Sequence, residues 1–388
     1  MNILEEARAI KEDMIRNRRA LHVIPEIGLK LPKTVAYVAS ELDKLGIRYE
    51  IKEDISCIFA WIGEKPEEEG RKCILLRADM DALAVLDQTG EPFAVCEGRM
   101  HACGHDLHTS SLLGAARLLK AHESELNATV KLLFQAGEET FNGFESAIKA
   151  GVLENPVPDV AYTSHVFAMY PMNQVIYNKA IMSAFYGFEI TLTGIGGHGS
   201  APELCVSPIN AAVQVYLALQ SLIAREAPAS EEVALTIGQF TAGEAANIIP
   251  ATATLKGTLR AFNEDIRQEM IKRINEIVPA VAAAYRCTCD IKVLGDCPAV
   301  VNDPDFMQYC LDTIRDAGIS DDLKEDHVMV SEDFALAAAR IPSCYVIVGA
   351  CPADTARGLG QHNPAVRFNE DALVNAAASY AAIALNYR

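Results

Sequence analysis

The chain has 388 residues and is 50% hydrophobic, so it can bury a large core, and its length predicts two or three domains. A formal net charge of -18, with no basic patch to oppose it, excludes nucleic acid as a partner because a phosphate backbone would be repelled. No apolar run is long enough to span a membrane, and eleven scattered cysteines without a secretion signal indicate free thiols in the cytoplasm.

Helical and strand-like patterns alternate in the first part of the chain. Residues 1–22 form an amphipathic pattern that predicts a helix, and a second helix is predicted over 33–45. Short apolar runs at 73–77 and 130–135 predict strands. Strands that alternate with helices in this way indicate a largely parallel sheet covered on both faces.

The order of elements changes between about residues 183 and 294. Here the pattern reads strand, helix, strand, strand, helix, strand, which is the order of a ferredoxin-like (βαββαβ) domain. The earlier strand-and-helix pattern then resumes. We therefore predict an α/β protein whose main domain, residues 1–182 and 295–388, is interrupted by a second domain of residues 183–294.

One short stretch is rich in possible ligands. Residues 100–110, MHACGHDLHTS, place three histidines and a cysteine within eight positions. Cys103 and His105 would point to different sides of a helix, but they can converge from a loop, and a helical pattern begins directly after them. An ordinary buried thiol is the competing interpretation of Cys103.

Three distant stretches supply the remaining ligand types. Each follows an apolar or glycine-rich segment, at the predicted end of a strand or loop, where α/β sheets place their active sites. These residues are Glu138 and Glu139, His165, and His362. A single histidine is more often structural than a ligand, but the repeated placement favours a metal site.

Eight motifs then follow one another along nearly the whole chain: LRADMDAL, MHACGHD, QAGEE, GGHGS, NIIP, GTLR, SEDF and QHNP. In this order they resemble the M20 metallopeptidase family, and most closely its amidohydrolase branch of N-acyl-amino-acid and hippurate hydrolases. The resemblance implies a zinc-peptidase-like catalytic domain and an inserted lid and dimerisation domain, hence a homodimer. It also implies two divalent metal ions per subunit, held by Cys103, His105, Glu139, His165 and His362.

A pair of metal ions suits amide hydrolysis, because ions polarise the carbonyl group and lower the pKa of a bridging water. Sulfur and nitrogen ligands together suit zinc, cobalt or nickel, and one thiolate among harder donors does not exclude manganese. We expect zinc or manganese first, with nickel or cobalt as alternatives.

The adjacent residues Glu138 and Glu139 cannot both face the same ion if the chain is extended there. The resemblance assigns Glu139 to the metal and Glu138 to proton transfer from the water to the departing amine. We expect Asp81 to orient a metal ligand, with Asp79 as a weaker candidate.

Other acidic residues and histidines near the motifs have a simpler interpretation. Asp106 and His108 are expected to cap and pack the start of the helix after residue 105. Glu332 and Asp333, in the SEDF motif, are expected to be structural or to support a ligand rather than to act in catalysis.

The second domain is also expected to contribute to the site. The glycine-rich stretch GIGGHGSAP exposes His198, which in the resembling enzymes reaches the partner subunit's metal site and stabilises the oxyanion. Asn247 and Arg260 match family positions that hold a substrate carboxylate, although a surface ion pair is the competing interpretation of Arg260.

Some positions depart from the family pattern and affect the choice of substrate. Where relatives have small residues, this chain has Phe141 and Phe144 after the glutamate pair, and Phe185 and Tyr186 at the domain junction. We expect these rings to narrow the pocket or make it more apolar.

Together these features predict a cytoplasmic, homodimeric, metal-dependent amidohydrolase that cleaves N-acyl amino acids or related small amides. A dipeptidase or aminopeptidase-type exopeptidase would use the same metal chemistry with a different pocket. Two alternatives belong to other classes. One is a cysteine hydrolase with Cys103 as nucleophile and His105 or His101 as base, and the other is a non-catalytic binding protein.

Overall fold

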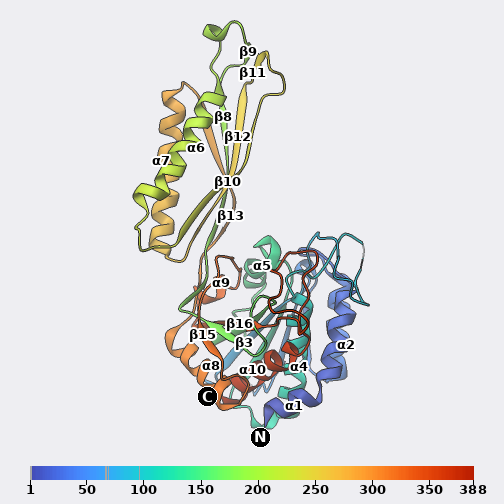
Figure 1. Ribbon diagram of the computed structural model, residues 1–388. Helices are drawn as coiled ribbons and strands as arrows, with labels where there is room; N and C mark the ends of the chain where they lie inside the picture. Colours follow the sequence, from blue (N-terminus) through green and yellow to red (C-terminus); the bar gives the residue numbers. More distant parts are fainter. Residues whose placement is uncertain (1, 66–67, 69, 96) are drawn as a thin grey trace. The chain divides into compact units, whose positions relative to one another are not determined.

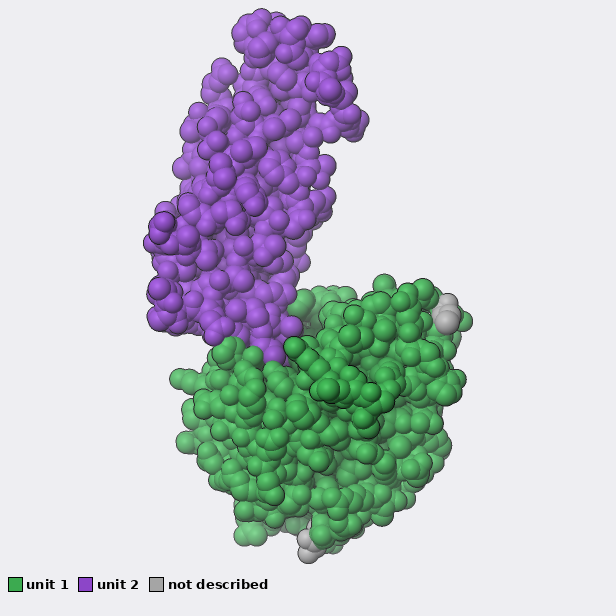
Figure 2. All heavy atoms as spheres, viewed as in Figure 1, with its two compact units in different colours: residues 1–181, 301–327, 333–388 green, residues 182–300, 328–332 purple. Residues whose placement is uncertain are grey.

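The computed structural model describes residues 2–65, 68, 70–95 and 97–388. The chain divides into two compact units, coloured separately in Figure 2: unit 1 is residues 1–181, 301–327 and 333–388, and unit 2 is residues 182–300 and 328–332. Unit 2 therefore extends beyond the predicted segment 183–294, because it also includes residues 182, 295–300 and 328–332.

Unit 1 is built around an eight-stranded sheet with the order β1-β2-β4-β3-β5-β16-β6-β15 (Figure 1). The neighbouring strands β4, β3, β5 and β16 run parallel, and all their residues are buried, as is typical of strands covered on both faces. The predicted α/β fold with a large, mostly parallel sheet is confirmed. The strands are β1 (Arg48–Lys52), β2 (Cys57–Ile62), β3 (Cys73–Asp79), β4 (Thr129–Gln135), β5 (Val160–Phe167), β6 (Val175–Tyr177), β15 (Leu323–Glu325) and β16 (Ser343–Gly349).

Helices pack on this sheet and on one another, with α4 against both α10 and α2. The predicted helix over 1–22 is wrong in one respect, because Ile10 (φ -103°, ψ 10°) leaves the helical region and divides it into α1 and α2. Among the described residues, no helix is long and apolar enough to cross a membrane. The helices of unit 1 are α1 (Ile3–Ala9), α2 (Lys11–His22), α3 (Pro32–Lys44), α4 (His105–Ala121), α5 (Gly143–Lys149), α8 (Pro304–Asp316), α9 (Ala335–Ala338) and α10 (Ala372–Asn386).

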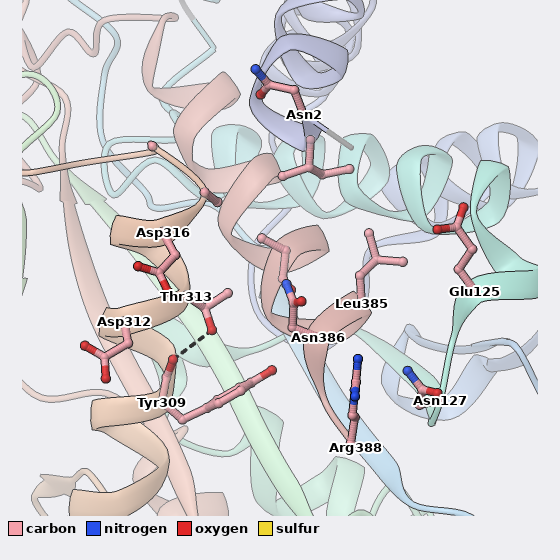
Figure 3. A pocket seen from close by; sticks show the side chains of 14 residues that line it. Asn2, Glu125, Asn127, Tyr309, Asp312, Thr313, Asp316, Leu385, Asn386 and Arg388 are labelled. Atoms are coloured by element: carbon pink, nitrogen blue, oxygen red, sulfur yellow. Dashed lines mark hydrogen bonds between the residues drawn. The ribbon is translucent and has the colours of Figure 1, made fainter.

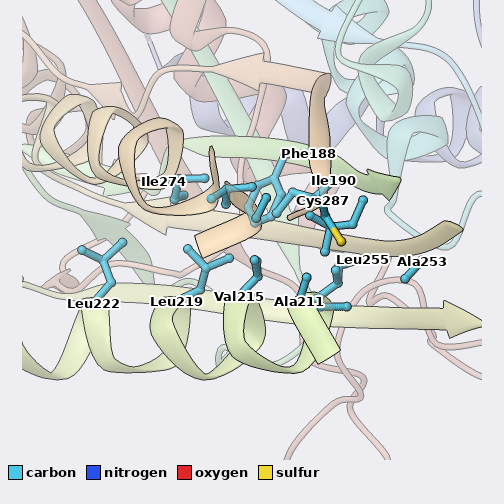
Figure 4. Packing of buried hydrophobic residues seen from close by; sticks show 14 of the residues in the cluster. Phe188, Ile190, Ala211, Val215, Leu219, Leu222, Ala253, Leu255, Ile274 and Cys287 are labelled. Carbon is cyan, nitrogen blue, oxygen red and sulfur yellow. The ribbon is translucent and has the colours of Figure 1, made fainter. Parts of the chain in front are cut away.

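Unit 2 has a four-stranded antiparallel sheet with the order β10-β12-β8-β13. Its elements follow the predicted βαββαβ order: β8 (Phe185–Thr193), α6 (Pro208–Glu226), β10 (Val233–Ala242), β12 (Thr252–Ala261), α7 (Glu264–Ala284) and β13 (Thr288–Cys297). Figure 4 shows the core, in which Phe188 and Leu255 of the sheet pack against Val215 and Leu219 of α6 and Ile274 of α7. A separate pair of short strands, β9 (Gly197–His198) and β11 (Ile248–Ile249), carries the glycine-rich stretch. The short strands β7 (Ala180–Met182) and β14 (Val300–Val301) lie where the chain passes between units.

A buried ionic cluster joins α2 to the start of α4. The imidazole of His22 contacts two carboxylates, with Nδ1 2.8 Å from Asp106 Oδ2 and Nε2 3.1 Å from Asp87 Oδ2. Arg18 Nε also donates to Asp106 Oδ2, at 2.9 Å. Gly104, not Asp106, occupies the N-cap position of α4, but Asp106 Oδ1 accepts the first-turn N–H of Leu107 at 3.0 Å, as expected of a residue that supports the helix start. Its other oxygen, Oδ2, binds Arg18 and His22.

This cluster predicts a pH dependence of stability. Burial alone would lower the pKa of His22, but Asp106 and Asp87 outweigh it, so the pKa is raised above 6.5. Because the pKa of His22 is higher in the folded than in the unfolded protein, its protonation stabilises the fold. This stabilisation is complete when the pH is below the pKa of the unfolded protein, and it is lost as the pH rises through the pKa of the folded protein. In urea unfolding, the difference in midpoint between the wild type and His22→Gln should therefore be largest below pH 6.5 and shrink above it. A difference that is constant with pH would contradict a charged His22.

Candidate metal centre

Neighbouring parallel strands of unit 1 end at the same edge of the sheet, and the predicted ligands follow those ends. Five parts of the chain reach this edge: the segments that follow β3, β4 and β16, the last residues of β5, and the start of α4. Because carboxyl ends of parallel strands lie side by side, residues far apart in sequence meet there. The segments carry Asp81, Glu138 and Glu139, His362, His165, and the pair Cys103 and His105.

The five predicted ligands form two overlapping groups. Cys103, His105 and His165 present ligand atoms that lie within 4.8 Å of one another, and so do Cys103, Glu139 and His362. The closest contacts are 3.4 Å from Cys103 Sγ to His165 Nε2 and 3.4 Å from His362 Nε2 to Glu139 Oε2. Cys103 belongs to both groups, and a thiolate can bridge two ions, so the arrangement suits a pair of ions.

The backbone fixes which nitrogen of two histidines faces this cluster. His105 Nδ1 lies 2.8 Å from the carbonyl oxygen of Asp81, and His165 Nδ1 lies 2.9 Å from that of Val166. Because carbonyl oxygens only accept, both Nδ1 atoms carry a hydrogen, and both Nε2 atoms face the cluster.

Two atoms of the cluster are buried without a hydrogen-bond partner among the described residues: His105 Nε2 and Glu139 Oε1, which lie 3.8 Å apart. Buried polar atoms are normally satisfied, so this pair indicates a missing partner. A nitrogen lone pair, a carboxylate oxygen and a thiolate are the donors that a divalent cation of the zinc type prefers. The donor set therefore fits a divalent metal ion.

The electrostatics of the cluster also favour positive charge. Burial alone would lower the pKa of His105, but Asp79, Asp81 and Glu139 outweigh it and raise the pKa to about 10. Burial alone would raise the pKa of Glu139, but His362 and His105 outweigh it and lower that pKa. Protons and metal ions thus compete for the same position, so metal binding should weaken as pH falls.

Gly104 sets the geometry between Cys103 and His105. Its φ of +96° lies in the left-handed region, and a Cβ there would lie 2.7 Å from Val166 Cγ2. A side chain at this position would therefore push β5 away from the start of α4. The turn places the thiol and the imidazole on the same cluster, as predicted for a loop that enters a helix.

The glutamate pair lies in a 3-10 turn, η3 (Glu138–Thr140), rather than in extended chain. Both backbone N–H groups donate to Asp81, at 3.2 Å each. Both side chains then approach His105 Nε2, at 3.9 Å for Glu138 Oε2 and 3.8 Å for Glu139 Oε1. The condition for separating them, an extended chain, is not met, because the tight turn brings the two adjacent side chains to the same side.

His108 is more closely tied to the cluster than the sequence indicated. Its Nδ1 lies 2.6 Å from Asp79 Oδ1, and its Nε2 accepts the N–H of Val166, next to His165, at 2.9 Å. Because the backbone N–H can only donate, Nε2 is the acceptor and Nδ1 carries the hydrogen that faces Asp79. Burial would raise the pKa of Asp79, but Arg77, His105 and His108 outweigh it and hold the pKa well below its usual value. The spacing of His105 and His108, three apart on one helix face, is the signal that could have identified this support.

In unit 2, the candidate residues lie at two places: His198 and Asn247 at the β9–β11 pair, and Arg260 on β12. His198 is exposed in β9, and its Nδ1 accepts the N–H of Ser200 at 3.1 Å. The carbonyl oxygen of Asn247 accepts the N–H of Gly199 at 2.8 Å, so Asn247 and His198 lie on adjoining backbones. Arg260, on β12, donates to Ser331 Oγ at 2.7 Å and lies 5.4 Å from the ring of Phe185. Among the described residues it pairs with no carboxylate, which argues against a surface ion pair.

Two of the four rings expected to shape the pocket do not do so. Phe144 is 0% exposed and packs against Phe334, and Tyr186 is 4% exposed in the core of unit 2. Neither can line a pocket, because both are enclosed by other apolar side chains. Phe141 and Phe185 are partly exposed.

A hollow of about 970 Å³ lies elsewhere in unit 1, at the ends of α8 and α10 (Figure 3). Its lining includes Asn127, which precedes β4, Tyr309, Asp316 and Arg388. Since Asn127 marks the amino end of β4, this hollow is at the edge of the sheet opposite to the metal cluster. None of the candidate ligands lines it.

Comparison with known proteins identifies relatives along nearly the whole chain. The model of peptidase family M20/M25/M40 matches residues 75–386. IAA-amino acid hydrolase ILR1-like 4 of Arabidopsis thaliana is 34% identical over 381 residues, which cover 96% of this chain and 85% of the relative. Hippurate hydrolase of Campylobacter jejuni is 31% identical over 391 residues, which cover 100% of both chains.

A solved structure has the same fold. It is a dinuclear metal-binding peptidase of the M20 family from Bacillus subtilis, with a TM-score of 0.82 and 29% identity over 97% of this chain and 98% of that chain. The predicted family is therefore confirmed by the family match, by relatives above 30% identity and by the fold. The chain belongs to peptidase family M20/M25/M40 and is a metal-dependent amide hydrolase.

Proposed function

We propose that this enzyme removes the acyl group from N-acyl amino acids, using two divalent ions held by the five predicted ligands. The observation that carries the proposal is the pair of ligand groups that share Cys103. Relatives named as hydrolases of IAA-amino acids and of hippurate, both N-acyl amino acids, support this substrate class. Zinc or manganese is the first expectation for the metal, with nickel or cobalt as alternatives.

When bound, such ions would polarise the scissile carbonyl group and make an attacking water more acidic. The chain itself must then move protons and hold the substrate. Glu138 is the proposed proton carrier, because its carboxylate is buried, lies 3.9 Å from His105 Nε2 and is held by a turn that rests on Asp81. It would take the proton from water and deliver it to the departing amine.

Arg260 and Asn247 of unit 2 are the proposed partners of the substrate's carboxylate. The Arg260 guanidinium is free of carboxylate partners among the described residues and is fixed by Ser331 and Phe185. A planar guanidinium binds a carboxylate with two parallel hydrogen bonds, so it would select amides that end in an amino acid.

We also propose that two chains associate through the lid domain, residues 183–294. In support, helix α6 of unit 2 exposes four large apolar side chains to solvent, a common feature of protein interfaces. These are Ile209, Val213, Tyr216 and Leu217. None of the ten described cysteines forms a disulfide, which supports the proposed location in the cytoplasm.

If His198 acts in the partner subunit's site, two inactive variants should complement each other. His198→Ala should lower kcat by about 10²–10³-fold, because one donor to the developing oxyanion is lost. Mixing it with Glu138→Gln, after dissociation and reassociation, should restore part of the turnover, since one site of each mixed dimer is then complete. A mixture no more active than its components would contradict action across subunits.

A substrate panel tests the proposed class most directly. We expect turnover of N-acetyl and N-benzoyl amino acids, and little turnover of the matching N-acyl amines, which lack the carboxylate. Faster cleavage of dipeptides than of N-acyl amino acids would instead favour an exopeptidase with the same metal chemistry.

A cysteine hydrolase is the second candidate, because one observation fits it: Cys103 Sγ lies 3.4 Å from His165 Nε2. The imidazole nearest the thiol is thus His165, rather than His105 or His101 as the sequence indicated for this alternative. The two candidates differ in the effect of chelators, since a thiolate nucleophile needs no metal. Full activity after complete metal removal would favour the cysteine hydrolase.

A further inference from the structure

The buried carboxylate of Asp333 accepts hydrogen bonds from both ends of the loop that carries the two glutamates. Gln135, the last residue of β4, donates from Nε2 to both carboxylate oxygens of Asp333, at 2.8 and 2.9 Å. Phe144, in the first turn of α5, donates its backbone N–H to Asp333 Oδ2 at 2.7 Å. Asp333 thus holds together the two ends of the segment 136–143, which contains Glu138 and Glu139.

These contacts require a charged, acceptor-only side chain. Asp333 is 0% exposed, and Arg77 Nη2 donates to its Oδ1 at 3.2 Å. Arg77 also donates from Nε to Gln135 Oε1 at 2.8 Å, which fixes the orientation of the amide so that Gln135 Nε2 faces Asp333. Both oxygens of Asp333 therefore accept from donors, and the guanidinium balances the buried charge.

The segment between the two ends has little freedom. A Cβ on Gly143 would lie 2.0 Å from the carbonyl oxygen of Ala136, and the N–H of Gly143 donates to Gly137 O at 3.1 Å. In the middle of the segment, the backbone N–H groups of both glutamates donate hydrogen bonds to the Asp81 carboxylate. A carboxylate oxygen of Asp333 also lies within 4.8 Å of one of Glu138. The direction of both glutamate side chains therefore depends on how the ends are held.

We propose that Asp333 is a positioning residue for the hydrolysis, acting through the loop that holds Glu138 and Glu139. This inference rests on the proposed roles of those two glutamates in proton transfer and metal binding. Asp333 would act through its hydrogen bonds to Gln135 and Phe144 and not on the substrate itself. Its role is to keep the proton carrier and the metal ligand at fixed positions relative to His105.

The substitution Asp333→Asn tests this role with almost no change in volume. The amide places an NH2 group against Gln135 Nε2, Phe144 N–H or Arg77, so one donor meets another and the loop end is released. We expect kcat to fall by about 10–100-fold with KM little changed, the effect typical of residues that support metal ligands. Titration of the metal-free protein with cobalt(II), followed by visible absorption, should show altered bands and weaker binding of one ion, because Glu139 is displaced.

The double variant Gln135→Glu with Asp333→Asn separates positioning from simple destabilisation. In it, the carboxylate introduced at position 135 would accept from Arg77 and from the amide introduced at position 333. The oxygen of that amide can still accept from Phe144, and the net charge of the cluster is restored, but the NH2 group still faces Arg77 Nη2, so the recovery should be partial. We expect kcat and the cobalt(II) spectrum to recover towards the wild type. Asp159→Asn is the matched control: Asp159 accepts the N–H of Cys73 at 2.8 Å, at the other end of β3, so its loss should lower stability without changing kcat.

Two results would overturn the inference. One is a wild-type kcat and cobalt(II) titration in Asp333→Asn. The other is a double variant that recovers its urea unfolding midpoint but neither its kcat nor its cobalt(II) spectrum. If Asp333→Asn does not fold, the double variant alone decides. The cobalt(II) titration does not depend on turnover. If the wild-type enzyme cleaves no N-acyl amino acid, the proposed function is refuted, and the titration still tests whether Asp333 positions Glu139.

Discussion

Replacing Glu138 with glutamine is expected to lower kcat by about 10²–10⁴-fold while both metal ions stay bound. The amide has nearly the same shape as the carboxylate, and the backbone N–H of residue 138 can still donate to Asp81. It cannot take up a proton at neutral pH, so the step from water to the departing amine loses its carrier. Steady-state kinetics on an N-acyl amino acid, with metal content measured on the same sample, check this result.

The control for this variant is Glu145→Gln. Glu145 lies on the exposed face of α5, the helix that follows the glutamate turn, and pairs with Lys149 at 2.6 Å. It has the same residue type as Glu138 but does not belong to the metal cluster. Its kcat should equal that of the wild type. Wild-type turnover in Glu138→Gln with full metal content would show that another group moves the proton.

Removing the thiol of Cys103 should have the largest effect of any single substitution. Cys103 is the one residue shared by both ligand groups, so Cys103→Ala weakens the binding of both ions at once. We expect a protein with little bound metal and no measurable turnover. Equilibrium dialysis against zinc or manganese, followed by elemental analysis, measures the loss directly.

Cys289→Ala is the matched control, because Cys289 is a partly exposed free thiol of β13 in unit 2. It should keep both its metal and its activity. Loss of turnover in Cys103→Ala with an unchanged metal content would contradict the ligand assignment and favour a nucleophilic thiolate.

The sequence could predict which side chains meet because strand ends and residue type are local properties. His165 near the end of an apolar strand, and Cys103 before a helical pattern, both point to the carboxyl edge of a parallel sheet. His362 is indicated by its place after a glycine-rich segment, and the family resemblance assigns it to the metal. All three contribute to the groups of ligand atoms found in the structure.

The course of the glutamate loop could not be predicted in the same way. Residues 138–140 form a 3-10 turn because Asp81 accepts the N–H groups of Glu138 and Glu139, and the loop ends meet on Asp333, far along the chain. Such contacts are tertiary and leave no pattern in the local sequence. The same reason explains Phe144, which is buried by contact with Phe334 instead of lining a pocket.

The break between α1 and α2 shows a further limit of periodicity. The apolar pattern of residues 1–22 continues through Ile10, so it predicts one helix, yet the backbone leaves the helical region there. Both helices bury apolar side chains, among them Leu4 of α1 and Met14 of α2. The apolar pattern therefore predicts which side chains are buried, but it does not predict the break between the helices.

We propose that five side chains of unit 1 hold two divalent ions without which the amide is not cleaved. This proposal is tested by adding zinc or manganese stepwise to chelator-treated protein and following hydrolysis of an N-acyl amino acid at each step. We expect no turnover in the metal-free protein and a rise that reaches its maximum at two equivalents per chain. Full turnover in protein shown by elemental analysis to be metal-free would contradict it.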